Sequence, residues 1–151
     1  MKIGIAAAAI IGWAAIGAFY SLAQSPPPRS VWDGVYTEQQ AKRGVALYGQ
    51  ECAKCHGESL TGADEAPPLA GGAFIANWDS LTVGDLFERI RISMPADRPG
   101  KLNREQIADI LSYVLSFNRF PAGKTELERQ TEVLKEIRIE AAKPDQKKGR
   151  E

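Results

Sequence analysis

The sequence predicts an all-α fold with three main helices. Three segments, at residues 37–52, 81–94 and 102–118, each combine a helix-capping signal with apolar residues spaced three or four apart. The alternation of apolar and polar residues that marks a half-buried strand is almost absent. A chain of 151 residues has room for one compact domain and its tails.

The first predicted helix begins after Thr37, whose hydroxyl group suits an N-cap. Gln40 lies three residues later, where its side chain would complete a capping box. The apolar residues that follow at helical spacing are Ala41, Val45, Tyr48 and Cys52. This helix therefore leads directly into a motif with two cysteines at residues 52–56.

The second predicted helix begins with the same device. Thr82 and Asp85 suit an N-cap and its partner, while Leu81 and Leu86 occupy the positions of a hydrophobic staple. Its apolar face contains Val83, Leu86, Phe87 and Ile90. Pro95 lacks a backbone N–H and clashes with a preceding helical turn, so the helix must end before it.

The third predicted helix also begins with an N-cap and a partner three residues later, Asn103 and Gln106. Its apolar stripe contains Ile107, Ile110, Leu111, Val114 and Phe117. The helix is expected to close near Asn118, because Pro121 follows shortly after.

Residues 57–77 lie between the first two helices, are rich in Gly, Pro and Ala, and follow neither helical nor strand spacing. They predict a loop with short turns at most. Loops of this length are uncommon inside small domains. We therefore expect this one to pack on something other than protein.

The N-terminal segment predicts export from the cytoplasm. Lys2 precedes an apolar run, and the small residues Ser21 and Ala23 suit cleavage of a signal peptide at residues 1–23. A run of about 20 apolar residues can also span a bilayer, so a retained anchor through residues 3–23 is the alternative. Both alternatives predict a periplasmic protein, soluble or tethered to the outer face of the inner membrane.

The remaining chain divides into a Pro-rich linker at residues 24–35, a folded domain at 36–123 and a charged extension at 124–151. Within the extension, residues 125–143 predict a helix whose apolar side contains Leu127, Leu134, Ile137 and Ala141. The end, from Pro144 onward, has the composition of a disordered tail. Nucleic acid is not an expected partner, because 19 Lys and Arg residues balance 19 Asp and Glu residues.

The motif that carries the chemistry is Cys52-Ala53-Lys54-Cys55-His56. In an exported chain, C-x-x-C-H predicts covalent attachment of haem c. Two thiols on one helical turn can add to the two vinyl groups of a porphyrin, and the next residue places an imidazole beneath the iron. The alternatives are a thioredoxin-like dithiol, a structural disulfide and, with fewest available ligands, a zinc site.

Composition restricts the second axial ligand of such a haem. The chain has one His and two Met, and Met1 lies in the predicted signal segment. Met94 is therefore the expected sixth ligand, with a Lys or Asn as the less favoured choice. The alternative is that Met94 fills a gap in the core. Its position between a helix end and Pro95 favours the ligand.

From residues 36 to 123, the chain resembles a monohaem class I c-type cytochrome of the bacterial periplasmic kind associated with quinoprotein dehydrogenases and terminal oxidases. The resemblance is carried by short motifs in order. They are Gly44 and Tyr48 before C-x-x-C-H-G, the segment Ala66-Pro67-Pro68-Leu69-Ala70-Gly71, Phe74 with Trp78, Ser93-Met94-Pro95, and Tyr113 with Asn118-Arg119-Phe120-Pro121.

The resemblance implies three main helices wrapped around one covalently bound haem, with a helical C-terminal extension. It implies that Gly44 and Tyr48 meet Ile110 and Tyr113 where the first and last helices cross. It also implies that the carbonyl group of Pro67, or of Pro68, accepts a hydrogen bond from the axial His ring. Leu69 and Phe74 would line the haem, and the Trp78 indole N–H would reach a propionate.

Filled axial positions predict an electron carrier that cycles iron between Fe(III) and Fe(II), not an enzyme. Its expected partners are redox proteins. The alternatives are a cytochrome subunit of a membrane respiratory complex or periplasmic dehydrogenase and, less favoured, a haem sensor or enzyme with an open iron site. A docking role is expected for a basic collar formed by Arg89, Arg91, Arg98, Lys101 and Arg104.

Overall fold

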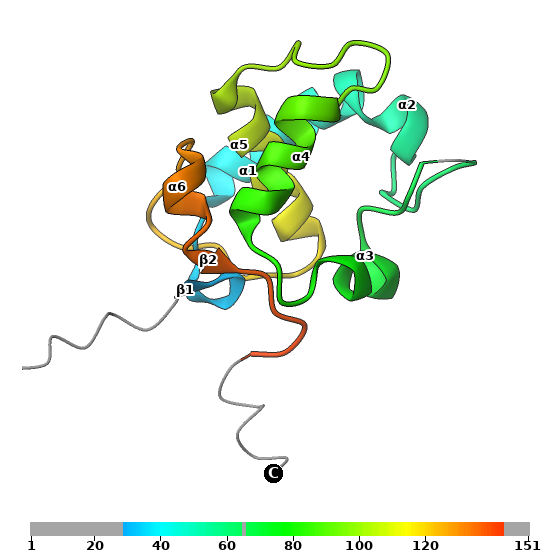
Figure 1. Cartoon of the computed structure of the whole chain (residues 1–151). Helices are drawn as coiled ribbons and strands as arrows, with labels where there is room; N and C mark the ends of the chain where they lie inside the picture. Colours follow the sequence, from blue (N-terminus) through cyan, green and yellow to red (C-terminus); the bar gives the residue numbers. More distant parts are fainter. Residues whose placement is uncertain (1–28, 65, 144–151) are drawn as a thin grey trace, which may run out of the picture.

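The computed structural model describes residues 29–64 and 66–143, and within them the fold is mainly helical (Figure 1). The elements are β1 (Arg29–Ser30), the short 3-10 helix η1 (Val31–Asp33), α1 (Glu38–Glu51), α2 (Ala53–His56), α3 (Gly71–Trp78), α4 (Val83–Ser93), α5 (Arg104–Phe117), α6 (Thr131–Leu134) and β2 (Ile137–Arg138). The expected signal peptide or anchor and the expected disordered tail lie outside the described residues. No helix in the described ranges has the length and apolar character needed to cross a membrane.

Helix α1 begins as predicted at Thr37, whose side chain accepts a hydrogen bond from the Gln40 backbone N–H at 3.1 Å. The prediction that the Gln40 side chain completes a capping box is wrong. The Gln40 amide instead accepts from the Leu127 N–H at 2.6 Å and donates to the Leu127 carbonyl at 3.1 Å. Ala41 and Tyr48 are buried as expected, but Val45 is 50 % exposed.

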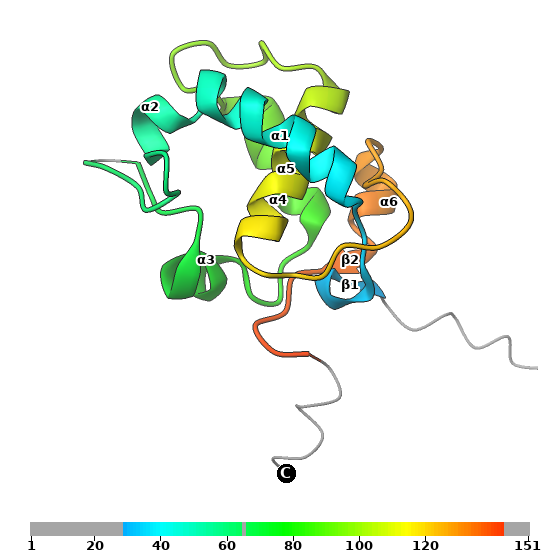
Figure 2. The same ribbon diagram turned by 180° about the vertical axis from the view of Figure 1, so that it is seen from behind.

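Helix α1 packs on α5, and the two cross closely in the reversed view (Figure 2). At the crossing, a Cβ atom at Gly44 would overlap the carbonyl oxygen of Asp109 and crowd Tyr113. The rings of Tyr48 and Tyr113 meet edge to face, with centroids 5.3 Å apart. Glycine at position 44 is therefore required by the close approach of the two backbones.

Capping boxes begin both α4 and α5, as predicted. In α4 the side chains of Thr82 and Asp85 bond each other's backbone N–H groups, and in α5 Asn103 and Gln106 do the same. The expected apolar residues are buried or packed against the core, except Phe117, which is 42 % exposed. Leu81 is also largely exposed, which argues against the expected staple with Leu86.

Residues 57–77 do not form the predicted continuous loop, because they contain most of α3. The N-cap residue of α3 is Ala70, which offers no side-chain hydrogen bond. The amide oxygen of Asn118, beyond the end of α5, accepts instead from the Gly71 N–H at 2.9 Å. The capping group is thus distant in sequence, and the local pattern carries no trace of the helix start.

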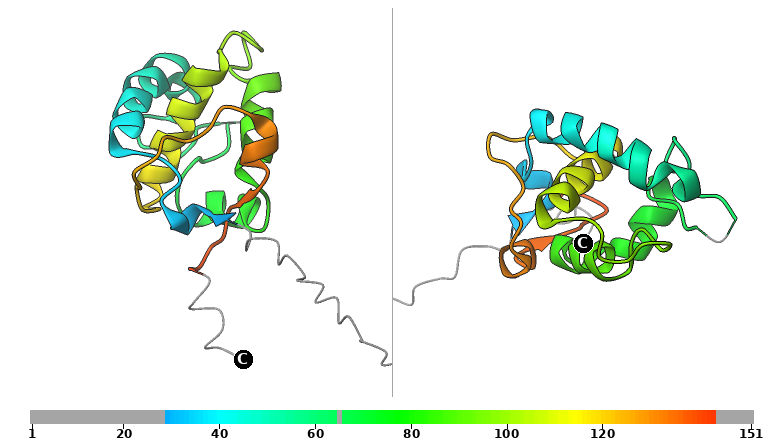
Figure 3. Two further views of the ribbon diagram at one scale, coloured as in Figure 1. Left: turned by 90° about the vertical axis from the view of Figure 1, so that its left-hand side faces the viewer. Right: turned by 90° about the horizontal axis from the view of Figure 1, so that it is seen from above.

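Residues 125–143 do not form the predicted long helix. They contain only the single turn α6 and the strand β2, which pairs in parallel with β1. Ile137 and Ile139 are buried on either side of exposed Arg138, the alternation of an extended chain, while Ala141 is exposed. Figure 3 shows this segment lying beside α4 and β1.

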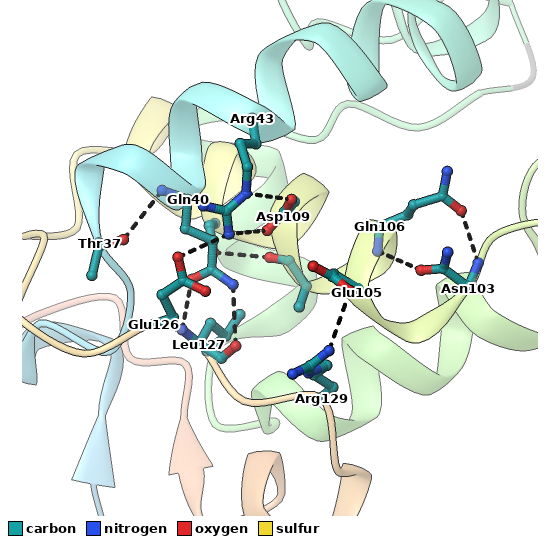
Figure 4. A network of polar contacts seen from close by, with 12 residues as sticks. Thr37, Gln40, Arg43, Asn103, Glu105, Gln106, Asp109, Glu126, Leu127 and Arg129 are labelled. Carbon is teal, nitrogen blue, oxygen red and sulfur yellow. Dashed lines mark hydrogen bonds and ion pairs between the residues drawn. The ribbon is translucent and has the colours of Figure 1, made fainter.

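We call residues 124–143 the C-terminal arm. Besides Gln40, it contacts Arg43 through Glu126 at 2.9 Å and Glu105 through Arg129 at 3.2 Å (Figure 4). Its buried residues Leu127, Leu134, Ile137 and Ile139 join the same core as Val31 and Val35. The packed unit therefore extends on both sides of the predicted boundaries at residues 36 and 123.

Candidate functional site

The cysteine motif lies at the junction of α1 and α2. Cys52 ends α1, donating its N–H to the Tyr48 carbonyl at 2.9 Å, and also begins the single turn of α2. Backbone N–H groups of Cys55 and His56 donate to the Cys52 carbonyl at 3.1 and 3.0 Å. The two thiols therefore sit on one turn, as C-x-x-C-H chemistry requires.

Both cysteines are free thiols, with Cys52 half-buried and Cys55 exposed. Burial, followed by the nearby Glu51 carboxylate, raises the pKa of the Cys52 thiol to about 11. The structural disulfide is thus not formed here, and the described fold lacks the βαβ setting of a thioredoxin-like dithiol. For zinc, no group of three or more His, Cys, Asp or Glu side chains in the described ranges is placed to hold a metal.

The imidazole of His56 has a defined orientation. The residue is 8 % exposed, and Nδ1 lies 2.8 Å from the Pro67 carbonyl oxygen. Because a carbonyl oxygen can only accept, Nδ1 must carry the hydrogen and donate it. In the neutral imidazole, Nε2 is then the nitrogen without a hydrogen, and its lone pair is available for a metal. The contact involves Pro67, not Pro68.

A cavity of about 830 Å³ adjoins this turn. Its wall is formed by the end of α1, by α2, α3, α4 and α5, by residues 63–64 and 66–69, and by the chain just after α4. Figures 1 and 2 show how these helices are arranged. Every predicted site residue borders it: Cys52, Cys55, His56, Pro67, Leu69, Phe74, Trp78 and Met94. The volume lies in the range of cofactor sites, and Phe74, Leu86, Ile90, Ile110 and Val114 supply an apolar wall suited to a porphyrin.

Met94 reaches the cavity from the end of α4. Its N–H donates to the Ile90 carbonyl at 2.9 Å, but its own backbone is extended, so the helix stops there. Its side chain is half-buried and does not belong to the fully buried core. The structure therefore brings the one thioether of the described chain to the same cavity as its one imidazole.

Glu51 is a site residue that sequence reasoning missed. It borders the cavity beside Cys52, its side chain is only 11 % exposed, and it accepts from Lys101 Nζ at 2.7 Å and Arg98 at 3.3 Å. These pairs connect the end of α1 to the loop that follows Met94. Their large sequence separation leaves no local signal by which they could have been found.

Three of the five cations of the expected basic collar form ion pairs, so the net positive charge is smaller than residues 89–104 alone suggest. Glu51 pairs with Arg98 and Lys101, and Glu88 pairs with Arg91 at 2.6 Å. Arg104 donates to the arm and lies over the Phe87 ring. The sequence count missed these pairs because both carboxylates lie outside residues 89–104, and the docking role of the collar stays a prediction. Arg89 has no ion pair in the described ranges and borders the cavity.

A turn carrying C-x-x-C-H, an oriented imidazole and a thioether from the residue that follows α4 all border one cavity, an arrangement that would suit a covalently attached haem. The family model described as cytochrome c oxidase, cbb3-type, subunit III matches residues 39–114, and the chain belongs to this family. This family consists of c-type cytochromes, which carry electrons, and residues 39–114 form such a domain.

Two known proteins are similar to the chain. Cbb3-type cytochrome c oxidase subunit CcoP of Azospirillum brasilense is 30 % identical over 92 residues, a match that covers 50 % of this chain and 30 % of CcoP. The chain thus corresponds to less than a third of that relative's length. The sulfane dehydrogenase SoxCD of Paracoccus pantotrophus matches with a TM-score of 0.48 and 22 % identity, over 78 % of this chain and 67 % of the SoxCD chain.

Proposed function

We propose that the chain holds one haem c, attached through Cys52 and Cys55 with His56 and Met94 as axial ligands, and carries single electrons between redox proteins outside the cytoplasm. The observation that supports this most is the convergence of the cysteine turn, His56 and Met94 on one cavity. The family membership supports the same class of cofactor.

In this proposal the polypeptide attaches, orients and encloses the cofactor. The two thiols of one turn attach it, Pro67 orients His56 through the 2.8 Å hydrogen bond, and Met94 supplies a thioether, which favours Fe(II). Haem, when bound, supplies a one-electron Fe(III)/Fe(II) couple. With side chains at both axial positions, no position is left for a substrate, so transfer occurs without bond formation.

The cavity wall limits water and polar reorganisation around the transferred charge. Phe74 is fully buried, and Leu69, Ile90 and Trp78 pack partly buried against the core. Such a wall keeps the local dielectric constant low, so little must rearrange at each transfer. We assign the indole N–H of Trp78 to a haem propionate, because it borders the cavity and a partly buried indole needs an acceptor.

We further propose that the partners are components of a respiratory oxidase or of a periplasmic dehydrogenase. The similarity to CcoP, an oxidase subunit, favours a cytochrome that is fixed to a complex over a free shuttle. Residues 1–23 would direct export or remain as an anchor, and the Pro-rich residues that follow would space the domain from the membrane.

The test is haem staining after denaturing electrophoresis of protein exported together with cytochrome c maturation machinery. We expect pigment that migrates with the chain and is lost in the Cys52→Ala, Cys55→Ala double variant. Lys54→Ala, within the same motif but without a thiol, should keep the pigment. A colourless wild-type chain, or pigment that acid acetone extracts, would contradict covalent attachment.

A further inference from the structure

Asn118 uses its whole side-chain amide to join three parts of the chain. Its Nδ2 group donates to the carbonyl oxygens of Val114, in α5, and of Leu69, both at 2.9 Å. Its Oδ1 atom accepts from the Gly71 N–H, also at 2.9 Å. One residue at the end of α5 thus fixes the position of residues 69–71 and begins α3.

The segment held by Asn118 also carries the hydrogen-bond acceptor of His56. The Pro67 carbonyl, which accepts from His56 Nδ1, lies two residues before Leu69. Pro67 and Pro68 each have a ring-restricted φ angle, so the short link to Leu69 is stiff. The Leu69 N–H additionally donates to the Leu60 carbonyl at 2.8 Å. Residues 67–71 are therefore held between His56 at one end and Asn118 at the other.

We propose that Asn118 is a positioning residue for the axial imidazole. It acts on His56 through the stiff segment between Leu69 and Pro67 and touches neither His56 nor the iron. This inference rests on the proposed ligation by His56. It differs from ordinary helix capping because it connects the end of α5 to the electron-donating strength of the ligand.

Removing the Asn118 amide should weaken the hydrogen bond between His56 and Pro67. An imidazole with a weaker acceptor at Nδ1 is less basic and stabilises Fe(III) less. The reduction potential should therefore rise. Loss of a hydrogen bond to a metal ligand typically changes metal affinity or activity by about tenfold or more. We therefore expect the ferrous-to-ferric ratio at a fixed electrode potential to increase by about tenfold, which corresponds to a rise in reduction potential of about 59 mV.

The test compares Asn118→Leu and Asn118→Ala with Asn103→Leu in the haem-loaded protein. Asn103 caps the opposite end of the same helix, so its replacement weakens α5 without touching residues 67–71. Redox titration should show a raised potential in both Asn118 variants and an unchanged potential in the Asn103 variant. An equal shift in all three would reduce Asn118 to a structural role and overturn the proposal.

Hydrogen exchange in the wild-type protein provides a test that does not require any variant to fold. Gly71 is exposed, so its N–H should be protected only through Asn118. Fast exchange there would overturn the proposal, as would an unchanged potential in Asn118 variants with intact haem and axial ligands. Failure of haem attachment in the wild type would instead refute the proposed function, so the two failures are distinguishable.

Discussion

At the scale of single residues, hydrogen bonds fix the orientation of the groups around the cavity. His56 donates to Pro67, and the Tyr48 hydroxyl donates to the carbonyl of Gly57, the residue that ends α2, at 2.7 Å. Burial raises the pKa of Tyr48, so this hydroxyl stays a donor at neutral pH. The turn α2, which carries Cys55 and His56, is thus fixed by one hydrogen bond from His56 and by another from Tyr48 in α1.

Met94 determines whether the iron can bind an external ligand. If its thioether completes the coordination, the reduced wild-type protein should resist carbon monoxide, whereas Met94→Ala should bind it readily and show a lower reduction potential. Optical titration of the reduced proteins with carbon monoxide measures the binding, and redox titration measures the potential. Ile90→Ala is the matched control, because Ile90 borders the same cavity but offers no ligand atom. Ready binding by the wild type would favour the haem sensor or enzyme instead.

Apart from the residues that the family resemblance implied, the site residues located from the sequence are those whose signal is local or compositional. The motif at residues 52–56 is contiguous, and Met94 follows from the scarcity of ligands in the chain. The role of Glu51 could not be found in this way, and Asn118 was identified only as the expected end of the third helix and as part of a family motif. Their roles arise from contacts with Lys101 and Gly71, 50 and 47 residues away in sequence, which exist only once the chain is folded.

At the scale of elements, the same distinction separates the helices that were predicted from the elements that were missed. Helices α1, α4 and α5 begin with caps supplied by their own neighbouring residues. Helix α3 has none, because Asn118 supplies its cap. The C-terminal arm was misread as a helix because Leu127, Leu134 and Ile137 fit helical spacing. The segment is extended instead, because β2 pairs with β1 and Ile139 is buried on the same side as Ile137.

The crossing of α1 and α5 should tolerate no side chain at position 44. In Gly44→Ala the new methyl group would overlap the Asp109 carbonyl, and we expect the free energy of unfolding to fall by about 1–3 kcal/mol. Denaturant titration measures the change. Gly49→Ala, in the same helix, meets nothing within 4 Å and should be neutral or slightly stabilising. Equal effects at the two positions would contradict the close approach.

At the scale of the whole molecule, the two ends of the described chain close on one another and on the core. The Trp32 indole donates to the Glu140 carbonyl at 2.8 Å, and β1 pairs with β2. The arm also crosses α4, where the Thr131 hydroxyl donates to Glu88 at 2.5 Å. Leu127, Leu134, Ile137 and Ile139 of the arm belong to the same buried core as Val31 and Val35, so these outer segments add buried apolar surface to a small domain.

The attachment of the arm at Glu88 should make stability depend on acid. Hydrogen bonds from Arg91, and then from Thr131, lower the pKa of Glu88 from 4.5 to about 2. A lowered pKa in the folded state means that this stabilisation is complete above pH 4.5 and is lost as the pH falls toward about 2. Denaturant unfolding of the haem-loaded wild type and of Glu88→Gln across this range should show a stability difference that shrinks with acidification.

Glu128→Gln is the matched control for that series, because it removes a carboxylate from the same arm. Glu128 is exposed and forms no ion pair within the described ranges, so its replacement should give a difference that hardly varies between pH 4.5 and 2. Thr131→Val should reproduce part of the Glu88 effect, since it removes one of the two causes of the lowered pKa. If the difference for Glu88→Gln stayed constant with pH, the carboxylate would not hold the arm through its charge, and apolar burial alone would have to account for the attachment.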